Sequence, residues 1–508
     1  MKPAFAFQKV GVCLALTILL GLSPMVLPAS LSDVNAGGVG PLSGQEETRE
    51  EKIRRVENGL LPPTVLKGET PLPMKLEERM QFHKTPGVSL VIINEGRIEW
   101  ARSYGVAEAG GTKRVSLDTM FQSASISKPV VAMAALRLVQ QGKLSLDEDV
   151  NRKLKSWKIP ENEFTKDQKV TLRRLLSHSA GITVSGFLGY TAAAERPSLI
   201  QILDGEKPAN SAPVRVDMVP GTKFRYSGGG YVVLQQLLVD VAGLPFERLM
   251  DDSVLRKLEM NHSSFEQQLS AAEAEFAASG HLPDGSVIPG RWYSYPELGP
   301  AGLWTTPSDL ARFVIEIQRS REGKSNKILS KKMIEQMLTP QMENSALGLF
   351  VEGQDKSARF TFSGSNVGFK SYLVGYLNAG RGAVVMTNSE TGAPLVVEIL
   401  RSIAAAYNWP DYHPREKVIA QIDPAIYDAY VGEYEIVPGF ILTVTREGNR
   451  LISEARGQPR SEMFPESETT FFVKDADAQF TFVKDDHGKV VQVNIKRGTR
   501  EFKARKIK

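Results

Sequence analysis

Residues that bind metal ions or form disulfide bonds are scarce in this sequence. Its 508 residues include one cysteine, Cys13, and six histidines, none of which stand in His-x-x-x-His spacing. A single cysteine excludes a disulfide framework and a thiolate zinc cage, and the scattered histidines argue against a histidine metal site. We therefore expect no metal and no cofactor.

An excess of charge of one sign is also lacking. The chain has 62 Lys+Arg and 58 Asp+Glu, so its formal net charge is +4. This balance lacks the basic excess of a nucleic-acid-binding surface, so we expect no nucleic-acid partner. Hydrophobic residues make up 42% and charged residues 24%, which is ordinary globular composition. The length suggests about two or three domains.

One long apolar run is present, and it lies at the N-terminus. Two lysines precede the run Val10–Leu22, and small or Pro residues follow it, which is the pattern of a secretory signal peptide. A single membrane anchor is the alternative, but the run is shorter than the roughly 20 residues that cross a bilayer. We predict a signal peptide over residues 1–29, cleaved after Ala29 or Ala36, and hence a periplasmic or secreted protein. The cysteine lies inside the run, which disfavours a lipid anchor, and no later segment predicts a stable membrane span after cleavage.

Changes of composition indicate three further parts of the chain. Residues 30–75 are rich in Gly, Pro and charge and are predicted to be a linker, although Glu46–Arg55 could form a short solvated helix. Residues 76–410 form a first domain, with two strand-like runs around Asn94–Gly96 where a hairpin turn is expected. Residues 411–508 contain short alternating runs separated by turns, which predict a small antiparallel β-barrel or sandwich.

The most informative motif of the first domain is a single Ser-x-x-Lys. Ser125 and Lys128 stand three residues apart, so on a helix they lie on one face, a turn apart. Pro129 is tolerated in the first turn, which places Ser125 at the helix N-terminus, and Gly142 is a natural C-terminal stop. A serine hydroxyl becomes a nucleophile when a base takes its proton, and a lysine with a pKa lowered by burial can be that base. A lone match also arises by chance, so the rest of the sequence decides its meaning.

Two later blocks support a catalytic interpretation. Tyr226 stands in a Gly-rich turn before an amphipathic helix, where its phenol could relay a proton to a leaving group. A half-buried core tyrosine is the alternative. The second block is the strand-like run 359–376, which is interrupted by Gly364 and Gly368. Glycine there fits close approach of a substrate to an edge of the sheet.

The sequence resembles the serine β-lactamase and penicillin-binding-protein-like hydrolases, in particular the branch of class C β-lactamases, D-aminopeptidases and esterases. The matching stretches are Ser125–Lys128, Val170–Ile182, Tyr226–Ser227, Ala301–Phe313 and Ser363–Phe369. The resemblance covers the first domain. It implies an α/β (α+β) fold with an antiparallel sheet flanked by helices and a helical subdomain, followed here by the small all-β C-terminal domain.

The resemblance also implies a role for each matching residue. Ser125 would be the acylated nucleophile, Lys128 its general base and Tyr226 the acid/base partner. The backbone N–H groups of Ser125 and Ser365 would form the oxyanion hole, and His178 would be a structural residue of its motif. The substrate would be a small molecule or a peptide, and the resemblance leaves the oligomeric state open.

Two positions depart from the family pattern. Where the family has Tyr-x-Asn this chain has Tyr226–Gly228, which removes a side-chain amide that would touch a substrate. Where the family has Lys or His before Ser/Thr-x-Gly this chain has Phe362–Gly364. Phe carries no charge, so it can neither bind a substrate carboxylate nor help to lower the pKa of Lys128. The expected substrate-binding residues are Phe362, Ser363, Gly364 and Gly228.

The leading interpretation is an exported serine hydrolase that acts through an acyl-enzyme on ester or amide substrates. Phe362 argues against efficient hydrolysis of penicillins. A peptidoglycan carboxypeptidase or a D-amino-acid peptidase is an alternative within the enzyme class. A catalytically weak or inactive member that serves as a binding module of the cell envelope is the alternative outside it, and Phe362 is its main support.

Overall fold

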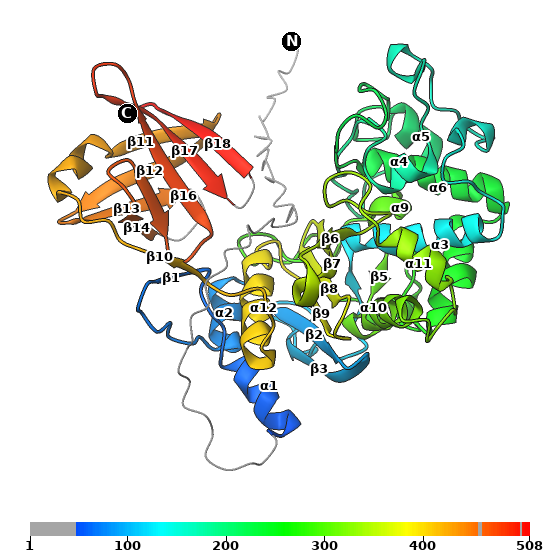
Figure 1. Cartoon of the computed structure of the whole chain (residues 1–508), viewed down its shortest axis with the longest axis horizontal. Coiled ribbons are helices and arrows are strands. Elements are labelled where there is room, and N and C mark those ends of the chain that lie inside the picture. Colours follow the sequence, from blue (N-terminus) through cyan, green and yellow to red (C-terminus); the bar gives the residue numbers. More distant parts are fainter. Residues whose placement is uncertain (1–46, 456–459, 498–499) are drawn as a thin grey trace, which may run out of the picture.

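The computed structural model describes residues 47–455, 460–497 and 500–508 (Figure 1). The predicted signal peptide, residues 1–29, lies outside the described residues. Figure 1 shows a central sheet with helices on both faces, a lobe of helices on one side and a barrel of strands on the other. The expected mixed fold with a C-terminal all-β domain is confirmed.

Six antiparallel strands form the central sheet, in the order β3-β2-β9-β8-β7-β6. The predicted hairpin joins β2 to β3, where Glu95 and Gly96 have φ angles of 51° and 68°, the left-handed values that a tight two-residue turn needs. A short pair, β4 and β5, stands apart from this sheet. The strands are β2 (Gly87–Asn94), β3 (Arg97–Gly105), β4 (Phe121–Gln122), β5 (Trp304–Thr305), β6 (Phe350–Glu352), β7 (Arg359–Asn366), β8 (Phe369–Tyr376) and β9 (Gly382–Thr387).

Alternate side chains of β2 enter two different cores, one on each face of the sheet. Val88, Leu90 and Ile92 pack in one core, and Val91 and Ile93 pack in the other. Helices α1, α2 and α12 cover the first face, and α10 packs against the second. These helices are α1 (Arg49–Glu57), α2 (Leu76–Phe82), α10 (Pro307–Arg321) and α12 (Ala393–Tyr407).

The other helices gather mainly in the lobe at the right of Figure 1. Helix α6 is largely buried there and packs against α4, α5 and α9. In the described part of the chain, no single helix has the length and apolar character to cross a membrane, although the bent pair Gly228–Ala242 and Phe246–Leu258 meets the criteria of length and composition. The helices are α3 (Ser127–Gln140), α4 (Leu172–Leu176), α5 (Leu199–Asp204), α6 (Gly228–Ala242), α7 (Phe246–Met250), α8 (Ala271–Phe276), α9 (Leu298–Ala301) and α11 (Lys331–Met337).

Part of the predicted linker, residues 30–75, belongs to the folded core. A capping box begins α1, in which the Thr48 hydroxyl accepts from the Glu51 N–H and the Glu51 carboxylate accepts from the Thr48 N–H. Ile53 and Val56 are 1% and 2% exposed, and α1 packs against α12. The linker expectation fails here because one narrow apolar stripe among many charges is enough to bury one side of a helix.

The C-terminal domain is a closed barrel of eight antiparallel strands, so the barrel alternative is the one that forms. Pairing of β11 with β18 closes it. Aromatic rings fill its interior, with the Tyr430 and Phe482 centroids 4.4 Å apart and Phe471 5.7 Å from Phe482. The strands are β11 (Gly432–Val437), β12 (Phe440–Glu447), β13 (Arg450–Ala455), β14 (Ser461–Pro465), β15 (Thr470–Val473), β16 (Ala478–Lys484), β17 (Val490–Arg497) and β18 (Arg500–Lys506).

A small parallel sheet lies at the junction between the two domains. In it, β1 (Thr64–Leu66) pairs with β10 (Arg415–Lys417). Three ion pairs connect this region to the barrel: Arg415 to Asp477 at 2.8 Å, Lys417 to Glu466 at 2.6 Å and Lys474 to Glu69 at 2.6 Å. The barrel is therefore attached to the first domain through short strands and partly exposed ion pairs.

Candidate active site

Ser125 lies in a short 3-10 helix, η1 (Ala124–Ile126), which leads directly into α3. Ala124 has a φ of 54°, a left-handed conformation that is uncommon outside glycine. Ser127 holds the turn, because its Oγ donates to the Ala124 carbonyl at 2.6 Å and accepts from the Leu303 N–H at 3.0 Å. Such conformations persist where the surrounding structure enforces them, and they cluster at functional sites.

The structure places the Lys128 amine beside the Ser125 hydroxyl, as the spacing of the motif predicts. Lys128 Nζ is 3.0 Å from Ser125 Oγ and donates to the Pro300 carbonyl, also at 3.0 Å. The side chain is 2% exposed, and this burial lowers the pKa of Lys128 to about 7. A large fraction of the amine is therefore neutral near pH 7 and able to accept a proton.

Tyr226 lies at the other side of the amine, directly before α6. Ser227 is the N-cap of that helix, since its Oγ accepts from the Gly230 N–H at 2.9 Å. Lys128 Nζ is 4.9 Å from the centroid of the Tyr226 ring. Burial raises the pKa of Tyr226 above its usual value, and a hydrogen bond with Ser125 opposes this shift in part. The phenol is thus protonated and in reach of the serine.

Strand β7 closes the site opposite the helices. A Cβ on Gly364 would lie 2.0 Å from the Ser123 carbonyl oxygen, so glycine is required for β7 to approach the serine turn. Ser371 Oγ donates to the same carbonyl at 2.8 Å. The close approach at Gly364 is therefore one between two segments of the chain, and the approach of a substrate there stays a prediction. The approach of the two segments brings β7 beside η1, the placement that an oxyanion hole made of the Ser125 and Ser365 N–H groups requires.

A buried ion pair that the sequence analysis missed supports the turn after Ser365. The Glu390 carboxylate accepts from Lys370 Nζ at 2.8 Å and from the Gly368 N–H at 2.7 Å. Lys370 Nζ also donates to the Asn366 carbonyl at 3.2 Å. The whole of β9 separates the two charged residues in sequence, and no motif marks them.

The positions that depart from the family pattern lie among aromatic rings. A Cβ on Gly228 would lie 3.0 Å from the ring of Phe187. Phe187, which the sequence analysis missed, therefore occupies the space that a side chain at position 228 would enter. Phe362 is 3% exposed, with its ring centroid 5.4 Å from that of Phe350. Ser363 follows it in β7 with its side chain on the opposite face of the strand. At the two positions that depart from the family pattern, the structure therefore has aromatic rings in place of polar side chains.

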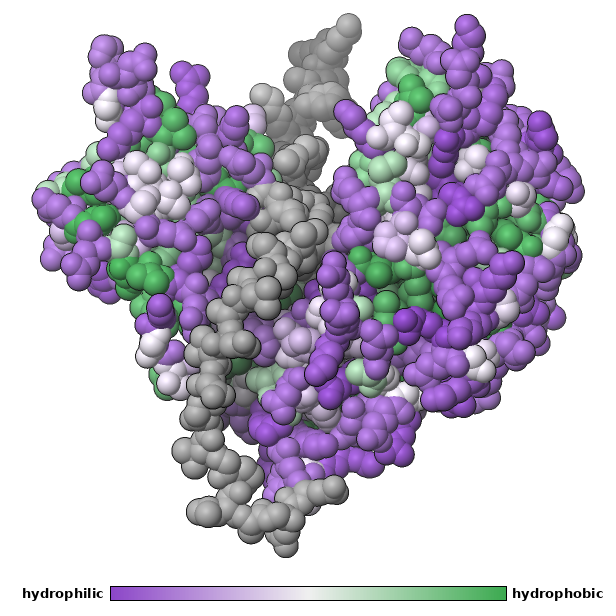
Figure 2. All heavy atoms as spheres, viewed as in Figure 1, coloured by the Kyte–Doolittle hydropathy of each residue, from purple (hydrophilic) through white to green (hydrophobic). Residues whose placement is uncertain are grey.

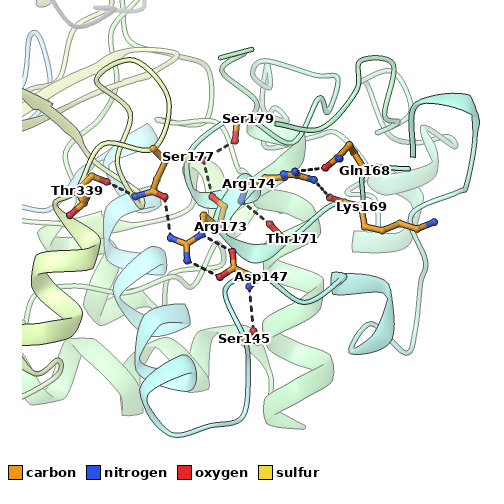
Figure 3. Close-up of polar contacts among 11 residues, drawn as sticks. Ser145, Asp147, Gln168, Lys169, Thr171, Arg173, Arg174, Ser177, Ser179 and Thr339 are labelled. Carbon is orange, nitrogen blue, oxygen red and sulfur yellow. Dashed lines mark hydrogen bonds and ion pairs between the residues drawn. The ribbon is translucent and has the colours of Figure 1, made fainter. Parts of the chain in front are cut away.

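Polar contacts fix helix α4, which leads into His178 (Figure 3). Arg173 binds both carboxylate oxygens of Asp147, at 2.7 and 2.8 Å. Arg174 donates to the Lys169 carbonyl at 2.6 Å. Figure 3 shows the two arginines reaching in different directions from α4, so the helix is tied to two separate loops.

The site thus combines a hydroxyl, a buried amine and a phenol. Together these groups can remove a proton from the serine, hold it and deliver it to a leaving group. Among residues 47–455, 460–497 and 500–508, no group of three or more His, Cys, Asp or Glu side chains is placed to hold a metal ion.

A serine beside a buried lysine and a phenol, on this mixed fold, defines the class of serine-dependent acyl-transfer hydrolases. Residues 74–408 match the family described as Beta-lactamase, which covers more than half of the chain. The chain belongs to the beta-lactamase family. Residues 416–508, the barrel, match a domain of unknown function, DUF3471.

Individual relatives agree with this family. Penicillin-binding protein 4* of Bacillus subtilis (strain 168) is 25% identical over 449 residues, which cover 81% of this chain and 92% of the relative. The octameric penicillin-binding protein homologue from Pyrococcus abyssi has a TM-score of 0.59 at 22% identity and covers 84% of this chain and 98% of its own. The beta-lactamase/D-alanine carboxypeptidase from Yersinia pestis complexed with citrate has a TM-score of 0.50 at 19% identity, covering 65% and 96%. At these identities the two structures show a shared fold.

Proposed function

We propose that this protein is an exported serine hydrolase that forms an acyl-enzyme at Ser125. One observation carries the proposal: the buried Lys128 amine lies 3.0 Å from Ser125 Oγ. Burial favours the neutral amine, which is the form that can act as a base. The N-terminal sequence pattern supports export.

The proposed reaction has two halves, acylation of Ser125 and hydrolysis of the acyl-enzyme, and Lys128 and Tyr226 transfer protons in both. The neutral Lys128 amine accepts the proton of Ser125 Oγ while Oγ bonds to the substrate carbonyl carbon. The oxyanion accepts hydrogen bonds from the N–H groups of Ser125 and Ser365. Tyr226 gives its proton to the leaving alcohol or amine as the old bond to carbon breaks, and Lys128 reprotonates the phenol. Water then attacks the acyl group, and its proton returns through the same groups to Ser125.

The proposed substrates are neutral acyl esters or amides. Phe362 stands where related enzymes have a cation, and its ring is buried against Phe350. An apolar ring gives no hydrogen bond to a substrate carboxylate, whereas it can pack against an uncharged acyl or alcohol group. Phe187 beside Gly228 adds a second apolar surface.

Labelling with a fluorophosphonate probe tests this function. The probe should attach to Ser125, located by mass spectrometry of peptides. Ser125→Ala should abolish labelling, and Lys128→Ala should slow it by about 100-fold or more. Ser145→Ala and Lys143→Ala, exposed positions just after the same helix, are matched controls that should label normally. Labelling that persists in Ser125→Ala at another serine would contradict the proposal.

A weak or inactive protein that binds envelope components is the second candidate. The aromatic rings at Phe362 and beside Gly228 favour it, because they replace polar groups that recognise substrate in the family. A protein that the probe fails to label, although it is folded by circular dichroism, would support this candidate over the hydrolase.

A further inference from the structure

His178 contacts three consecutive residues around the proposed acid/base tyrosine. Its carbonyl accepts from the Arg225 N–H at 2.8 Å, and its Nδ1 accepts from the Ser227 N–H at 3.2 Å. Between these two bonds, its ring lies against Tyr226, with centroids 4.4 Å apart and ring planes inclined by 33°. His178 therefore binds the residue before Tyr226 and the residue after it, and its ring packs against one face of the Tyr226 ring.

The imidazole of His178 is neutral and has one defined tautomer. Burial and the charge of Lys128 lower the pKa of His178 to about 3. Because Nδ1 accepts a hydrogen bond, the proton of the neutral ring resides on Nε2. Nε2 is buried without a hydrogen-bond partner among the described residues.

His178 is also in an unfavourable backbone conformation. Its φ is 56°, in the left-handed region. A buried polar group without a partner and a left-handed non-glycine residue each cost on the order of 1–3 kcal/mol. An apolar residue would avoid the unpaired Nε2, but it would keep the backbone strain and would leave the Ser227 N–H without its acceptor. The polar ring at this position therefore does more than fill space.

The segment that carries His178 is held firmly. Ser177 Oγ donates to the Arg173 carbonyl at 2.9 Å and shares a hydrogen bond with Ser179 Oγ at the same distance. The Ser179 carbonyl accepts from the Gly221 N–H at 2.7 Å. Figure 3 shows this serine pair at the end of α4, beside the arginine contacts described above. A fixed support of this kind is what a residue that orients another side chain needs.

We propose that His178 is a positioning residue that holds the Tyr226 phenol in line with Ser125 and Lys128. The proposal rests on the proposed function and adds a requirement to it. Its distinguishing consequence concerns the leaving group. A p-nitrophenolate departs without a proton, whereas an alkoxide must receive one as it leaves. A displaced Tyr226 should therefore impair alkyl esters far more than nitrophenyl esters.

The test compares kcat/KM for two butyrate esters that give the same acyl-enzyme, ethyl butyrate and p-nitrophenyl butyrate. The variants are His178→Asn, which tolerates the left-handed φ but has no ring, and His178→Phe, which has a ring but no acceptor for Ser227. We expect either folded variant to lose about 10-fold or more on the ethyl ester relative to the nitrophenyl ester. Phe350→Leu is the matched control for packing, because the Phe350 ring stacks at 6.4 Å from the His178 ring, and it should leave the ratio of the two esters unchanged.

A second measurement separates positioning from a general structural effect. In a Tyr226→Phe background, the change at His178 should no longer alter the ratio, because no phenol remains to be positioned. A folded His178 variant with an unchanged ratio, or an effect that persists fully without the phenol, would overturn the proposal. Failure of the proposed function looks different: Ser125→Ala would then keep the turnover of both esters.

Discussion

Lys128 is a basic side chain enclosed by the protein, and its protonation should govern the rate of acylation. Burial lowers its pKa to about 7, and the neutral form alone can take the proton of Ser125. The neutral fraction rises with pH, so labelling by a fluorophosphonate should accelerate from about pH 5 and level off above about pH 8. Second-order rate constants measured across this range check the prediction. A profile with its midpoint near the ordinary lysine value, about 10.4, would show that burial does not act in this way.

Phe362 should determine how the protein ranks neutral and anionic substrates. A hydrogen bond to a charged group contributes about 1.5–3 kcal/mol, so Phe362→His should raise the turnover of a cephalosporin relative to a p-nitrophenyl ester by about 10-fold to 100-fold. Phe362→Leu is the control that changes the ring but adds no polar group. Chromogenic assays of both compounds measure the ratio. Faster hydrolysis of cephalosporins than of neutral esters by the unchanged protein would contradict the argument.

At the scale of residues, the candidate reactive groups were easier to predict from the sequence than the groups that surround them. Ser125 and Lys128 are linked by helical spacing, which is a local property and is readable from the chain. Phe187 and the pair Lys370–Glu390 contact residues that are not their sequence neighbours, and no single-chain pattern reports such contacts. The resemblance marked His178 as a structural residue, but its contacts with Tyr226 and Ser227 came only from the structure. For the same reason, the atom that Gly364 must avoid, the Ser123 carbonyl, became visible only in three dimensions.

Strand β7 must lie close to the serine turn for the site to exist, and Gly364 sets this distance. Gly364→Ala would bring a Cβ to 2.0 Å from the Ser123 carbonyl and to 2.2 Å from Ser371 Oγ. We expect β7 to move away from η1, with loss of Ser125 labelling and a destabilisation of about 1–3 kcal/mol. Labelling and urea denaturation check the two effects.

Gly111→Ala serves as the control for Gly364→Ala. The nearest atom to a Cβ on Gly111 would be the Glu108 carbonyl oxygen at 3.2 Å, and this loop is exposed. Normal labelling in both variants would show that β7 does not need its close approach.

Elements marked by turn and capping residues were predicted from sequence, whereas α1 was only an alternative to a linker and its burial was not predicted. Glu95-Gly96 marks the β2–β3 hairpin, and Pro129 marks the first turn of α3. In α1, Ile53 and Val56 are the buried positions in a strongly charged helix. They pack against α12, which lies at the other end of the domain in sequence. Charge density alone therefore suggested a solvated segment, because the burial that stabilises α1 depends on a distant helix.

The two domains of the molecule should be separable. Each has its own hydrophobic core, and the junction consists of short strands and partly exposed ion pairs, which contribute little to stability. A chain that ends after Pro414 should remain monodisperse and keep its labelling at Ser125. Thermal unfolding and size-exclusion chromatography check this outcome. An aggregated or unlabelled product would show that the barrel is needed to complete the first domain.

At the scale of the whole molecule, alternation of residues predicted strands in the barrel but left barrel and sandwich equally open. Closure depends on pairing between β11 and β18, the first and last strands of the domain. Alternation reports which face of a strand is buried and says nothing about which strand lies beside it. Barrel and sandwich could therefore be distinguished only once the pairing of β11 with β18 was known.

The parallel pairing of β1 with β10 has a consequence for the topology of the first domain. Thr64 pairs with Arg415 and α1 packs against α12, so the first and the last elements of this domain lie side by side. A short peptide could join them, and new ends could be opened at the exposed turn Glu322–Lys324. Adjacent termini are the condition under which proteins tolerate circular permutation. The serine turn and β7 would then keep their places in a chain that begins and ends directly after α10. The geometry of the site would therefore not depend on where the sequence of this domain starts.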